Sequence, residues 1–409
     1  MFTARGVTVL FAGLAMWVVA RIIGSPGLEV VGIGILTLPL LAALFTRWSR
    51  QNITARHHLS DIRVAPGTRV TVSVDVDNRS PTPTSFLLLE DRVPASLGRP
   101  ARLVVSGIPP RSTQRVSYTV LPQTRGSYQL GPLFIDVSDP FALTRQRMEF
   151  AGQDELLVTP EIEDLESAAD PATGASFGAS RARQLFRTGQ EYYTMRAYQE
   201  GDDLRRIHWA SVARTGELMI RQDESSRRAN GLVFLDTRSA AVGQDRTITF
   251  ERAVSVAATL GVLLTRRGFL LRIATAESHP TAVTEDRFLD TLAGLSHSMT
   301  RTIGPALGSL RAGASADTSL VFVSGLPTGA ELPSIIRSAA GFGPKLAVLI
   351  YPADPGTLPP DRQAEFEGRA TAARLSLTRS GWDCVVLPPS MRLSERWHTP
   401  PERRYAHSV

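Results

Sequence analysis

Residues 198–215, YQEGDDLRRIHWASVART, combine side chains that could do chemistry within a short segment. Asp202 or Asp203 could act as a general base, His208 as its acid–base partner, and Arg205 or Arg214 as a clamp for an anion. If a helix begins with Asp202 as its N-cap, residues three or four positions apart share one helix face. The same face would also suit a buried network of ion pairs. This segment alone leaves catalysis, binding and structural pairing open.

A second set of candidate residues follows two predicted strands. Asp236 lies near the end of GLVFLDT and Ser239 follows that stretch, whereas Ser324 is the penultimate residue of SLVFVSG. Ligands of open α/β sheets bind at the carboxyl ends of strands, and oxygen atoms of this kind suit a hard divalent ion. Arg238 lies in the same turn, and its positive charge would compete with a cation. We therefore expect a degenerate site without metal or cofactor, in which Asp236 makes turn or capping hydrogen bonds.

Two further patterns limit the possible chemistry. The single cysteine, Cys384, excludes an internal disulfide framework. It precedes VVLPP in a predicted buried strand, which indicates a small core residue and not a nucleophile. The first strand of the C-terminal half is not followed by a glycine-rich phosphate loop, which argues against a Rossmann nucleotide site or a P-loop.

The composition indicates a folded protein of several domains. The chain has 409 residues, of which 43% are hydrophobic and 21% are charged. This length predicts two or three domains, and these fractions are ordinary for globular proteins. The net charge of +6 is carried mostly by arginines that are dispersed among acids. This dispersal favours a solvated surface over a nucleic-acid interface.

The N-terminal residues 1–50 are predicted to form a transmembrane helical hairpin. Residues 6–24 and 28–48 are apolar stretches separated by a short turn, SPG. Each is close to the roughly 20 residues that cross a lipid bilayer. The first stretch lacks a small-residue cleavage site and is followed at once by the second, so two spans are favoured over a cleaved signal peptide.

The basic residues around the hairpin predict its orientation. Arg5 precedes the first span, and Arg47 and Arg50 lie at the end of the second, whereas Arg21 and Glu29 lie near the turn. The positive-inside rule then places both ends of the hairpin on the cytoplasmic side, although Arg21 opposes this assignment. We expect a multi-pass protein of a bacterial cell membrane, with two spans and most of the chain in the cytoplasm.

Residues 51–162 are predicted to form an antiparallel β-sandwich. In RVTVSVDVDN, residues 69–78, valines alternate with polar residues, as in a half-buried strand. Further expected strands of similar length are 85–91, 101–107, 114–122, 131–139 and 154–160. The adjacent His57 and His58 are expected on the solvated surface. Residues 163–188 have the composition of a linker, and residues 189–230 form a separate segment around the charged motif.

Residues 231–390 are predicted to form a doubly wound α/β domain with a parallel sheet. Strand-like and helix-like stretches alternate along this part of the chain, and its first strand, GLVFLDT, is a continuous apolar run. The expected strands are 231–237, 269–275, 319–325, 345–354 and 383–389. The expected helices are 250–268, 285–297, 303–313, 329–341 and 361–381. Residues 391–409 are assigned to a basic C-terminal tail.

Two stretches resemble the signature of the bacterial "domain of unknown function 58" family. They are RGSYQLGPLFIDVSDPF, residues 125–141, and GQEYYTMRAYQEGDDLRRIHWASVARTGELMIRQDE, residues 189–224. The second supplies the motif positions Arg196, Tyr198, Gly201, Asp202, Arg205, Ile207, Trp209, Ala213 and Arg214. His208 departs from the pattern, because the family usually has an aspartate there.

The resemblance implies a membrane-anchored protein with a C-terminal domain similar to von Willebrand factor A. Relatives tend to be encoded beside MoxR-type AAA+ ATPases and transglutaminase-like membrane proteins, and the family has no established activity. The metal site of von Willebrand factor A domains uses the pattern Asp-x-Ser-x-Ser. Here the pattern reads Asp236-x-Arg238-x-Ala240, so the resemblance also implies a lost metal site, whose remaining candidates are Asp236, Ser239 and Ser324.

Three functions follow from these patterns. The first is a non-enzymatic adaptor on the lipid bilayer, held through residues 6–48, which binds a MoxR-type AAA+ ATPase and other membrane proteins in envelope-related assembly or maturation. Its binding residues would be Arg196, Tyr198, Gly201, Asp202, Arg205, His208, Trp209 and Arg214. The second is an enzyme with an acid–base site within residues 196–214. The third is a nucleic-acid binder, which the membrane tether and intervening acids disfavour.

Overall fold

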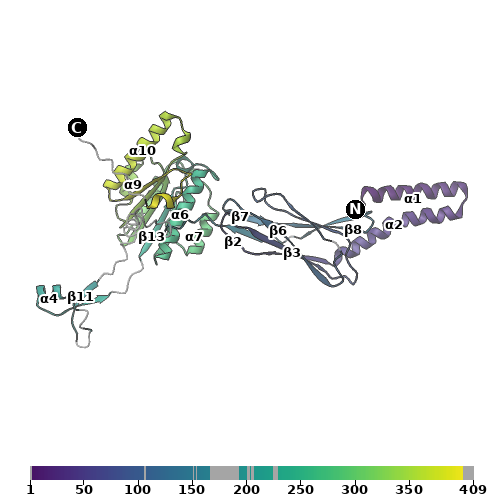
Figure 1. The fold of residues 1–409 in the computed structure, drawn as a ribbon, viewed down its shortest axis with the longest axis horizontal. Coiled ribbons are helices and arrows are strands. Elements are labelled where there is room, and N and C mark those ends of the chain that lie inside the picture. The colour runs from purple at the N-terminus through teal and green to yellow at the C-terminus, as the bar shows by residue number, and fades with distance from the viewer. Residues whose placement is uncertain are drawn as a thin grey trace. The chain divides into compact units, whose positions relative to one another are not determined.

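The computed structural model describes residues 2–105, 107–150, 152, 154–165, 193–199, 203, 207–223 and 229–398. The chain divides into two compact units, Met1–Thr159 and Pro160–Val409. Figure 1 shows the helices and strands of both units. The expected combination of two apolar N-terminal helices, several sheets and a mixed α/β composition is confirmed.

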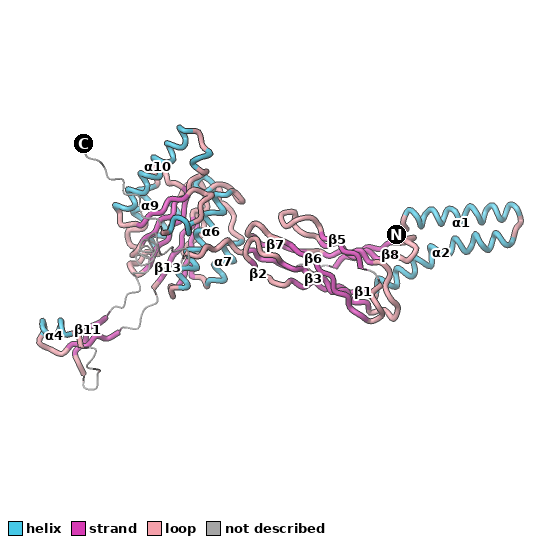
Figure 2. The backbone as a smooth tube through the Cα atoms, in the orientation of Figure 1, coloured by secondary structure: helices cyan, strands magenta, loops and turns pink. Residues whose placement is uncertain are grey.

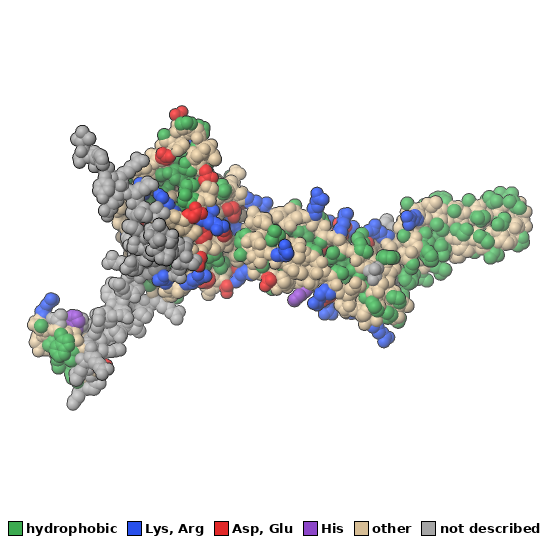
Figure 3. Space-filling model, in the orientation of Figure 1, with side chains coloured by type: hydrophobic (Ala, Val, Ile, Leu, Met, Phe, Trp, Pro, Cys, Tyr) green, Lys and Arg blue, Asp and Glu red, His purple; other side chains and the backbone are tan. Residues whose placement is uncertain are grey.

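Two long helices form the apolar hairpin at the start of the first unit. Helix α1 (Ala4–Ile23) and helix α2 (Pro26–Gln51) are both long and apolar enough to cross a membrane, and only 17% of each apolar window is buried. Figure 3 shows hydrophobic side chains covering this hairpin. Close packing needs glycine at Gly13 and Gly32, because a Cβ atom there would lie under 3.0 Å from the backbone of the facing helix.

The base of the hairpin is held by the loop between strands β8 (Leu133–Ser138) and β9 (Arg145–Phe150). Thr3 Oγ1 donates a 2.7 Å hydrogen bond to the Ala142 carbonyl, and Thr46 Oγ1 lies 2.7 Å from Thr144 Oγ1. The Asp139 carboxylate accepts from the Thr144 amide at 2.5 Å, which fixes the loop that receives both helices. The helices are thus tied to the β-strands at residues outside their apolar middle.

The described residues of the first unit form three small sheets. One is antiparallel, with order β1-β3-β6, and consists of β1 (Ile53–Leu59), β3 (Val70–Asn78) and β6 (Ser112–Val120). The second has order β5-β4-β8-β9 and adds β4 (Leu87–Asp91) and β5 (Ala101–Val105). The third has order β2-β10-β7 and consists of β2 (Arg63–Val64), β10 (Asp154–Val158) and β7 (Gly126–Leu130).

Alternating side chains of these strands form the core of the first unit. The four valines of β3 that alternate with polar residues are fully buried, as the period of two predicted: Val70, Val72, Val74 and Val76. At one end of β3 they pack against β4 and β8, and at the other end they pack against β7 and β10. The β1-β3-β6 sheet therefore contributes to two hydrophobic clusters, one with each of the other sheets.

A buried polar cluster joins strands of the three sheets. His57 of β1 has its Nε2 atom 3.1 Å from Asp91 Oδ2 on β4 and its Nδ1 atom 3.7 Å from Asp154 Oδ2 on β10. Tyr118 of β6 donates a 2.5 Å hydrogen bond to the same Asp91 oxygen. His58 is exposed as expected, but the His57 side chain is only 6% exposed, so the prediction of a solvated surface is wrong for His57.

The carboxylates determine the charge state of this cluster. Burial lowers the pKa of His57, but the Asp91 and Asp154 carboxylates raise it by more, so the pKa lies above 6.5. Burial and the Asp91 carboxylate both raise the pKa of Tyr118, which keeps its hydroxyl protonated as a donor. The protonated form of His57 would connect strands of the three sheets through ion pairs with Asp91 and Asp154.

The second unit contains a six-stranded sheet with order β15-β14-β13-β16-β17-β18. Its strands are β13 (Asn230–Leu235), β14 (Leu270–Thr275), β15 (Thr281–Ala282), β16 (Thr318–Gly325), β17 (Lys345–Ile350) and β18 (Asp383–Leu387). All neighbours pair in parallel except the short edge strand β15, which is antiparallel to β14. Cys384 is buried in β18, which confirms its predicted place in the core.

Helices cover both faces of this sheet, as Figure 2 shows. One face carries α6 (Ile248–Arg266), α7 (Glu285–Ala293) and α11 (Leu393–Trp397). The other carries α8 (Gly304–Ala312), α9 (Leu332–Ser338) and α10 (Pro360–Arg379). A short helix, α5 (Ser239–Val242), follows β13, and a 3-10 turn spans Pro355–Thr357. Helix α6 is apolar enough to span a membrane, but 78% of its apolar window is buried within the unit.

The packed part of the second unit extends past the predicted limits of 231 and 390. Glu163, placed at the start of the predicted linker, is buried and pairs with Arg252 Nη1 of α6 at 2.9 Å. The other Glu163 oxygen accepts from the Ser394 amide at 2.8 Å. Trp397, placed in the predicted tail, is 2% exposed in the core. Both flanking segments are therefore part of the folded unit in their described residues.

The His57 cluster predicts a pH-dependent stability of the first unit. Because the folded pKa is raised above 6.5, the stabilisation is complete below pH 6.5 and is lost as pH rises through the folded pKa. Thermal unfolding of the detergent-solubilised chain should therefore shift to lower temperature between pH 5.5 and 8.5, and His57→Gln should weaken this shift. His58→Gln is the matched control and should leave it unchanged. An undiminished shift in His57→Gln would contradict the assignment.

Candidate functional site

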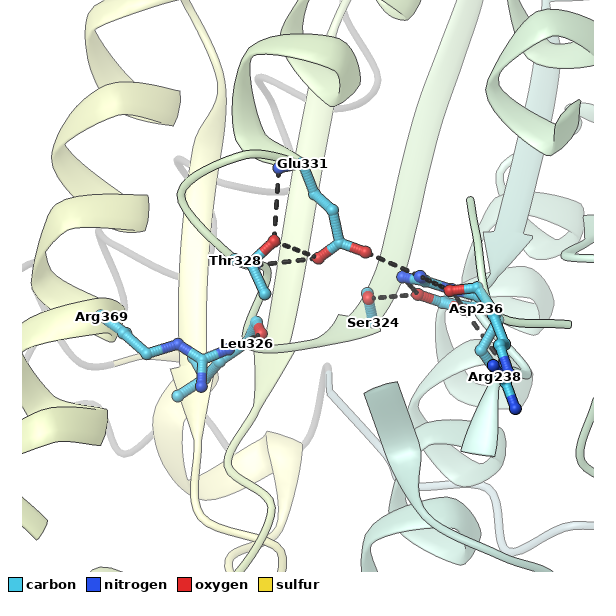
Figure 4. Close-up of polar contacts among 8 residues, drawn as sticks. Asp236, Arg238, Ser324, Leu326, Thr328, Glu331 and Arg369 are labelled. Atoms are coloured by element: carbon cyan, nitrogen blue, oxygen red, sulfur yellow. Dashed lines mark hydrogen bonds and ion pairs between the residues drawn. The ribbon is translucent and has the colours of Figure 1, made fainter. Parts of the chain in front are cut away.

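A buried ion pair lies at the carboxyl end of β13, where ligands of α/β sheets bind. Asp236 follows the strand, is fully buried, and its amide donates to the Val323 carbonyl of β16 at 2.8 Å. Arg238 contacts both carboxylate oxygens, with Nε 2.9 Å from Oδ1 and Nη2 2.8 Å from Oδ2. Ser324, at the end of β16, donates a 2.8 Å hydrogen bond to Oδ2. Figure 4 shows this arrangement.

The same guanidinium reaches a second carboxylate. Arg238 Nη1 lies 2.7 Å from Glu331 Oε1, and it also donates to the Arg301 carbonyl at 3.4 Å. The other Glu331 oxygen accepts from the amide and the hydroxyl of Thr328, each at 2.9 Å. One arginine thus connects the turn after β13 with the loop that follows β16. We refer to Asp236, Arg238, Ser324, Thr328 and Glu331 as the arginine clamp.

The electrostatics keep the clamp charged. Burial lowers the pKa of Arg238, but the carboxylates of Asp236 and Glu331 raise it by more, so its pKa lies above the ordinary value. Burial raises the pKa of Glu331, but the Thr328 donors and Arg238 lower it by more. The stabilisation from Glu331 is therefore present above pH 4.5 and is lost as pH falls through the lowered pKa.

The Arg238 guanidinium contacts the two Asp236 oxygens that a bound metal ion would need as ligands. Both oxygens already accept charge-assisted hydrogen bonds from Arg238. The Ser239 amide donates to the Ser298 carbonyl at 3.0 Å, and α5 starts at this residue. The structure thus brings Asp236 and Ser324 of the predicted set together, with a built-in cation between the carboxylates. Within the described ranges, His, Cys, Asp and Glu form no group of three suited to a metal.

The signature segment forms a separate small element of the second unit. Strands β11 (Tyr193–Ala197) and β12 (Met219–Asp223) pair antiparallel, and α4 (Trp209–Thr215) lies between them in the chain. The Tyr198 amide donates to the Leu218 carbonyl at 2.8 Å, and the His208 amide donates to the Met219 carbonyl at 3.0 Å. These bonds hold both ends of the connection against the start of β12.

His208 is the N-cap of α4, and this position corrects the predicted helix start. Its Nδ1 atom accepts from the Ser211 amide at 3.3 Å and lies 2.9 Å from Ser211 Oγ. We expected Asp202 to be the N-cap, but α4 begins at Trp209 and Asp203 lies outside any helix. Gly216 ends the helix with φ of 74°. Accepting through Nδ1 requires the neutral tautomer with its proton on Nε2.

The structure places some of the predicted motif residues and leaves others out. Gly201, Asp202 and Arg205 lie outside the described residues, so the proposed Asp202–His208 pair is not tested. Arg196 lies in β11, where its backbone faces Ile220 of β12. Tyr198 is half-buried, and Arg214 is exposed in the last turn of α4. Trp209 begins α4 and is 68% exposed.

The chain combines an open α/β sheet domain with a β-sheet unit and an apolar helical hairpin that is long enough to cross a membrane. Residues 194–379 match the family described as "Protein of unknown function DUF58", which confirms the resemblance carried by the signature segment. It is similar to the "Uncharacterized protein YeaD" of Bacillus subtilis (strain 168), with 24% identity over 229 residues. The match covers 54% of this chain and 55% of that protein, about half the length of each.

Similarity to solved structures is weak. The CARDB domain of a Pyrococcus furiosus protein, solved in complex with di-metal ions, is 12% identical with a TM-score of 0.20. That match covers 26% of this chain and 91% of the CARDB chain. A β-glucosidase from Erythrobacter marinus is 18% identical with a TM-score of 0.16, over 24% of this chain and 15% of the enzyme. TM-scores this low do not indicate a shared fold.

The clamp predicts a large effect for Arg238→Met. This change leaves the Asp236 carboxylate buried without its counter-charge, and breaking a buried pair in this way costs about 3–5 kcal/mol. Hydrogen–deuterium exchange should become faster in β13 and β16, which meet at Asp236. Adding Asp236→Asn should recover part of the loss, because the uncompensated charge is then removed. Unchanged hydrogen–deuterium exchange in Arg238→Met would show that the arginine clamp does not stabilise the carboxyl ends of β13 and β16.

The N-cap geometry predicts how His208 can be replaced. His208→Ala removes the acceptor for the Ser211 amide and should destabilise α4 by about 1 kcal/mol, a typical cost of losing an N-cap. His208→Asp keeps an acceptor at this position and should preserve the helix. Exchange of the amides of α4 would measure both variants. If Ala and Asp behave alike, capping is not the role of this side chain.

Proposed function

We propose that this protein is a membrane-anchored, non-enzymatic adaptor that docks a MoxR-type AAA+ ATPase in envelope-related protein assembly or maturation. The observation that carries the proposal is the exposure of Trp209, at 68%, within the family signature. Tryptophan and arginine are enriched among residues that dominate protein–protein binding, and Arg214 is exposed on the same short helix. A large aromatic side chain left in solvent gains most when a partner covers it.

The proposed topology has two spans, with the β-sheets and the α/β domain on the cytoplasmic side. Arg5 and Arg47 flank the hairpin at the end that joins the β-sheets, and both are exposed. Arg21, which opposed this orientation in the sequence, lies 3.3 Å from Glu29 across the turn. The pair is neutral overall, so the turn carries little net positive charge. This removes the main argument against the positive-inside orientation.

The arrangement of the strands supports two proposed fold assignments, a von Willebrand factor A-like domain and a β-sandwich. The sheet order β15-β14-β13-β16-β17-β18, with an antiparallel edge strand and helices on both faces, supports a von Willebrand factor A-like domain. The shared clusters between β3 and strands of both other sheets support a β-sandwich in the first unit. In this domain the Arg238 guanidinium stands where the metal-dependent pattern would place an ion, so docking would need no divalent cation.

The arrangement of the motif favours contact over the acid–base alternative. The Nδ1 atom of His208 accepts hydrogen bonds within its own helix, so this nitrogen is engaged in capping. A general base would instead direct its free lone pair toward a substrate. Trp209, immediately next in the chain, has its side chain in solvent.

Binding of purified full-length chain to a MoxR-type ATPase, with and without ATP, tests the proposal. Trp209→Ala should weaken binding by about 30-fold or more, as expected for a hot-spot residue worth about 2 kcal/mol. The matched control is Leu375→Ala on α10, which removes another exposed apolar side chain, 49% exposed. Wild type that binds no ATPase, or Trp209→Ala that binds as well as wild type, would refute the adaptor proposal.

A further inference from the structure

The length of α2 places the start of the β-sheets at the level of the lipid headgroups. Helix α1 has 20 residues and α2 has 26. At about 1.5 Å per residue they are about 30 Å and 39 Å long. The hydrocarbon core of a bilayer is about 30 Å thick, or about 40–45 Å with the headgroups. Since α1 already matches the core, the extra turns of α2 extend into the headgroup layer, and β1 begins at Ile53 directly beyond them.

A pocket opens at this end of the β1-β3-β6 sheet. Its volume is about 340 Å³, and it is lined by Asp77, Asn78, Arg79, Arg111, Ser112 and Thr113. The Arg79 amide donates to the carbonyl of Asn52, the residue after α2, at 2.8 Å. Asn78 faces Ile53 on one side and Ser112 on the other in the strand register. The pocket therefore lies beside the end of α2.

Two arginines give this pocket its positive charge. Arg79 and Arg111 are exposed, and neither side chain has an ion-pair partner in the described part of the chain. Other arginines of the first unit are paired, such as Arg115 with Asp75 at 2.6 Å. The acid in the pocket, Asp77, already accepts a 2.5 Å hydrogen bond from Thr113 Oγ1.

The backbone around the pocket is fixed independently of any ligand. Arg111 has φ of 51°, a left-handed conformation that costs a non-glycine residue about 1 kcal/mol or more. It is retained by the bond from the Arg111 amide to the Ser80 carbonyl at 3.2 Å. The side-chain Nδ2 of Asn78 donates to the backbone carbonyls of Thr82, Ile108 and Pro109. The loops that carry Arg79 and Arg111 are thus braced from within.

We propose that this pocket binds the phosphate group of an anionic phospholipid. Arginine forks match phosphate oxygens in geometry and charge, and the Ser112 hydroxyl lines the same wall. The acyl chains of such a lipid would lie along α2, where Leu44 is 64% exposed and Trp48 is 40% exposed. The site rests on the proposed membrane topology and is independent of the ATPase partner.

Lipid binding to the purified full-length chain in detergent tests this site, with phosphatidylglycerol and phosphatidylcholine compared by native mass spectrometry. The variant pair is Arg79→Gln with Arg111→Asn, because asparagine tolerates the left-handed backbone of position 111. Arg79→Gln alone provides a second variant that leaves position 111 intact. The control is Arg99→Gln, an exposed arginine in the loop after Asp91, at the far end of β4.

We expect wild type and Arg99→Gln to retain phosphatidylglycerol in preference to phosphatidylcholine. The double variant should bind phosphatidylglycerol about tenfold or more weakly, because two charge-assisted contacts are lost. Phosphatidylglycerol binding by Arg79→Gln should be weaker than that of wild type and stronger than that of the double variant. Equal binding of the two lipids, or equal binding by wild type and both variants, would overturn the proposal. Displacement of the lipid by millimolar inorganic phosphate would also overturn it, since the pocket would then be a site for free phosphate.

Discussion

The carboxylate buried at the carboxyl end of β13 requires compensation, and this edge of the sheet is arranged around that requirement. Asp236 is fully buried, and an unpaired carboxylate in such a place costs several kcal/mol. Arg238 and Ser324 satisfy its oxygens, and the remaining Arg238 nitrogen holds Glu331. A guanidinium that is part of the chain cannot dissociate as an ion can. The ends of β13 and β16 are therefore joined through side chains of the chain itself.

The same physical device holds other junctions of the chain. His57 lies between carboxylates from two other sheets, and Glu163 pairs with Arg252 at the point where the segment before the signature meets α6. In each case a buried charge takes its partner from a different element, so the pair fixes one arrangement of elements that apolar packing alone would leave less specific. Asp236, His57 and Glu163 thus serve as internal connections in the described structure.

Much of the fold could be predicted because its signals are local. The apolar length of α1 and α2, the alternation in β3 and the strand–helix order after residue 230 all depend on neighbouring residues. Strand β1, ITARHHL, was missed because only part of one face is apolar. The meeting of Asp236 and Ser324 followed from the alignment of parallel strand ends. Glu331, 93 residues from Arg238, gave no local signal, since only the topology brings the two together.

In the signature segment, His208 and Gly216 cap the helix α4, whereas the side chain of Trp209 is exposed to solvent. The family usually has aspartate where this chain has His208, and both residue types can accept the capping hydrogen bond at the start of α4. The departure therefore preserves a hydrogen-bond acceptor although it removes a carboxylate. Gly216 ends the same helix. Unlike His208 and Gly216, Trp209 does not cap α4, and its side chain remains 68% exposed. This exposed tryptophan on a short helix capped at both ends is the feature on which the proposed docking rests.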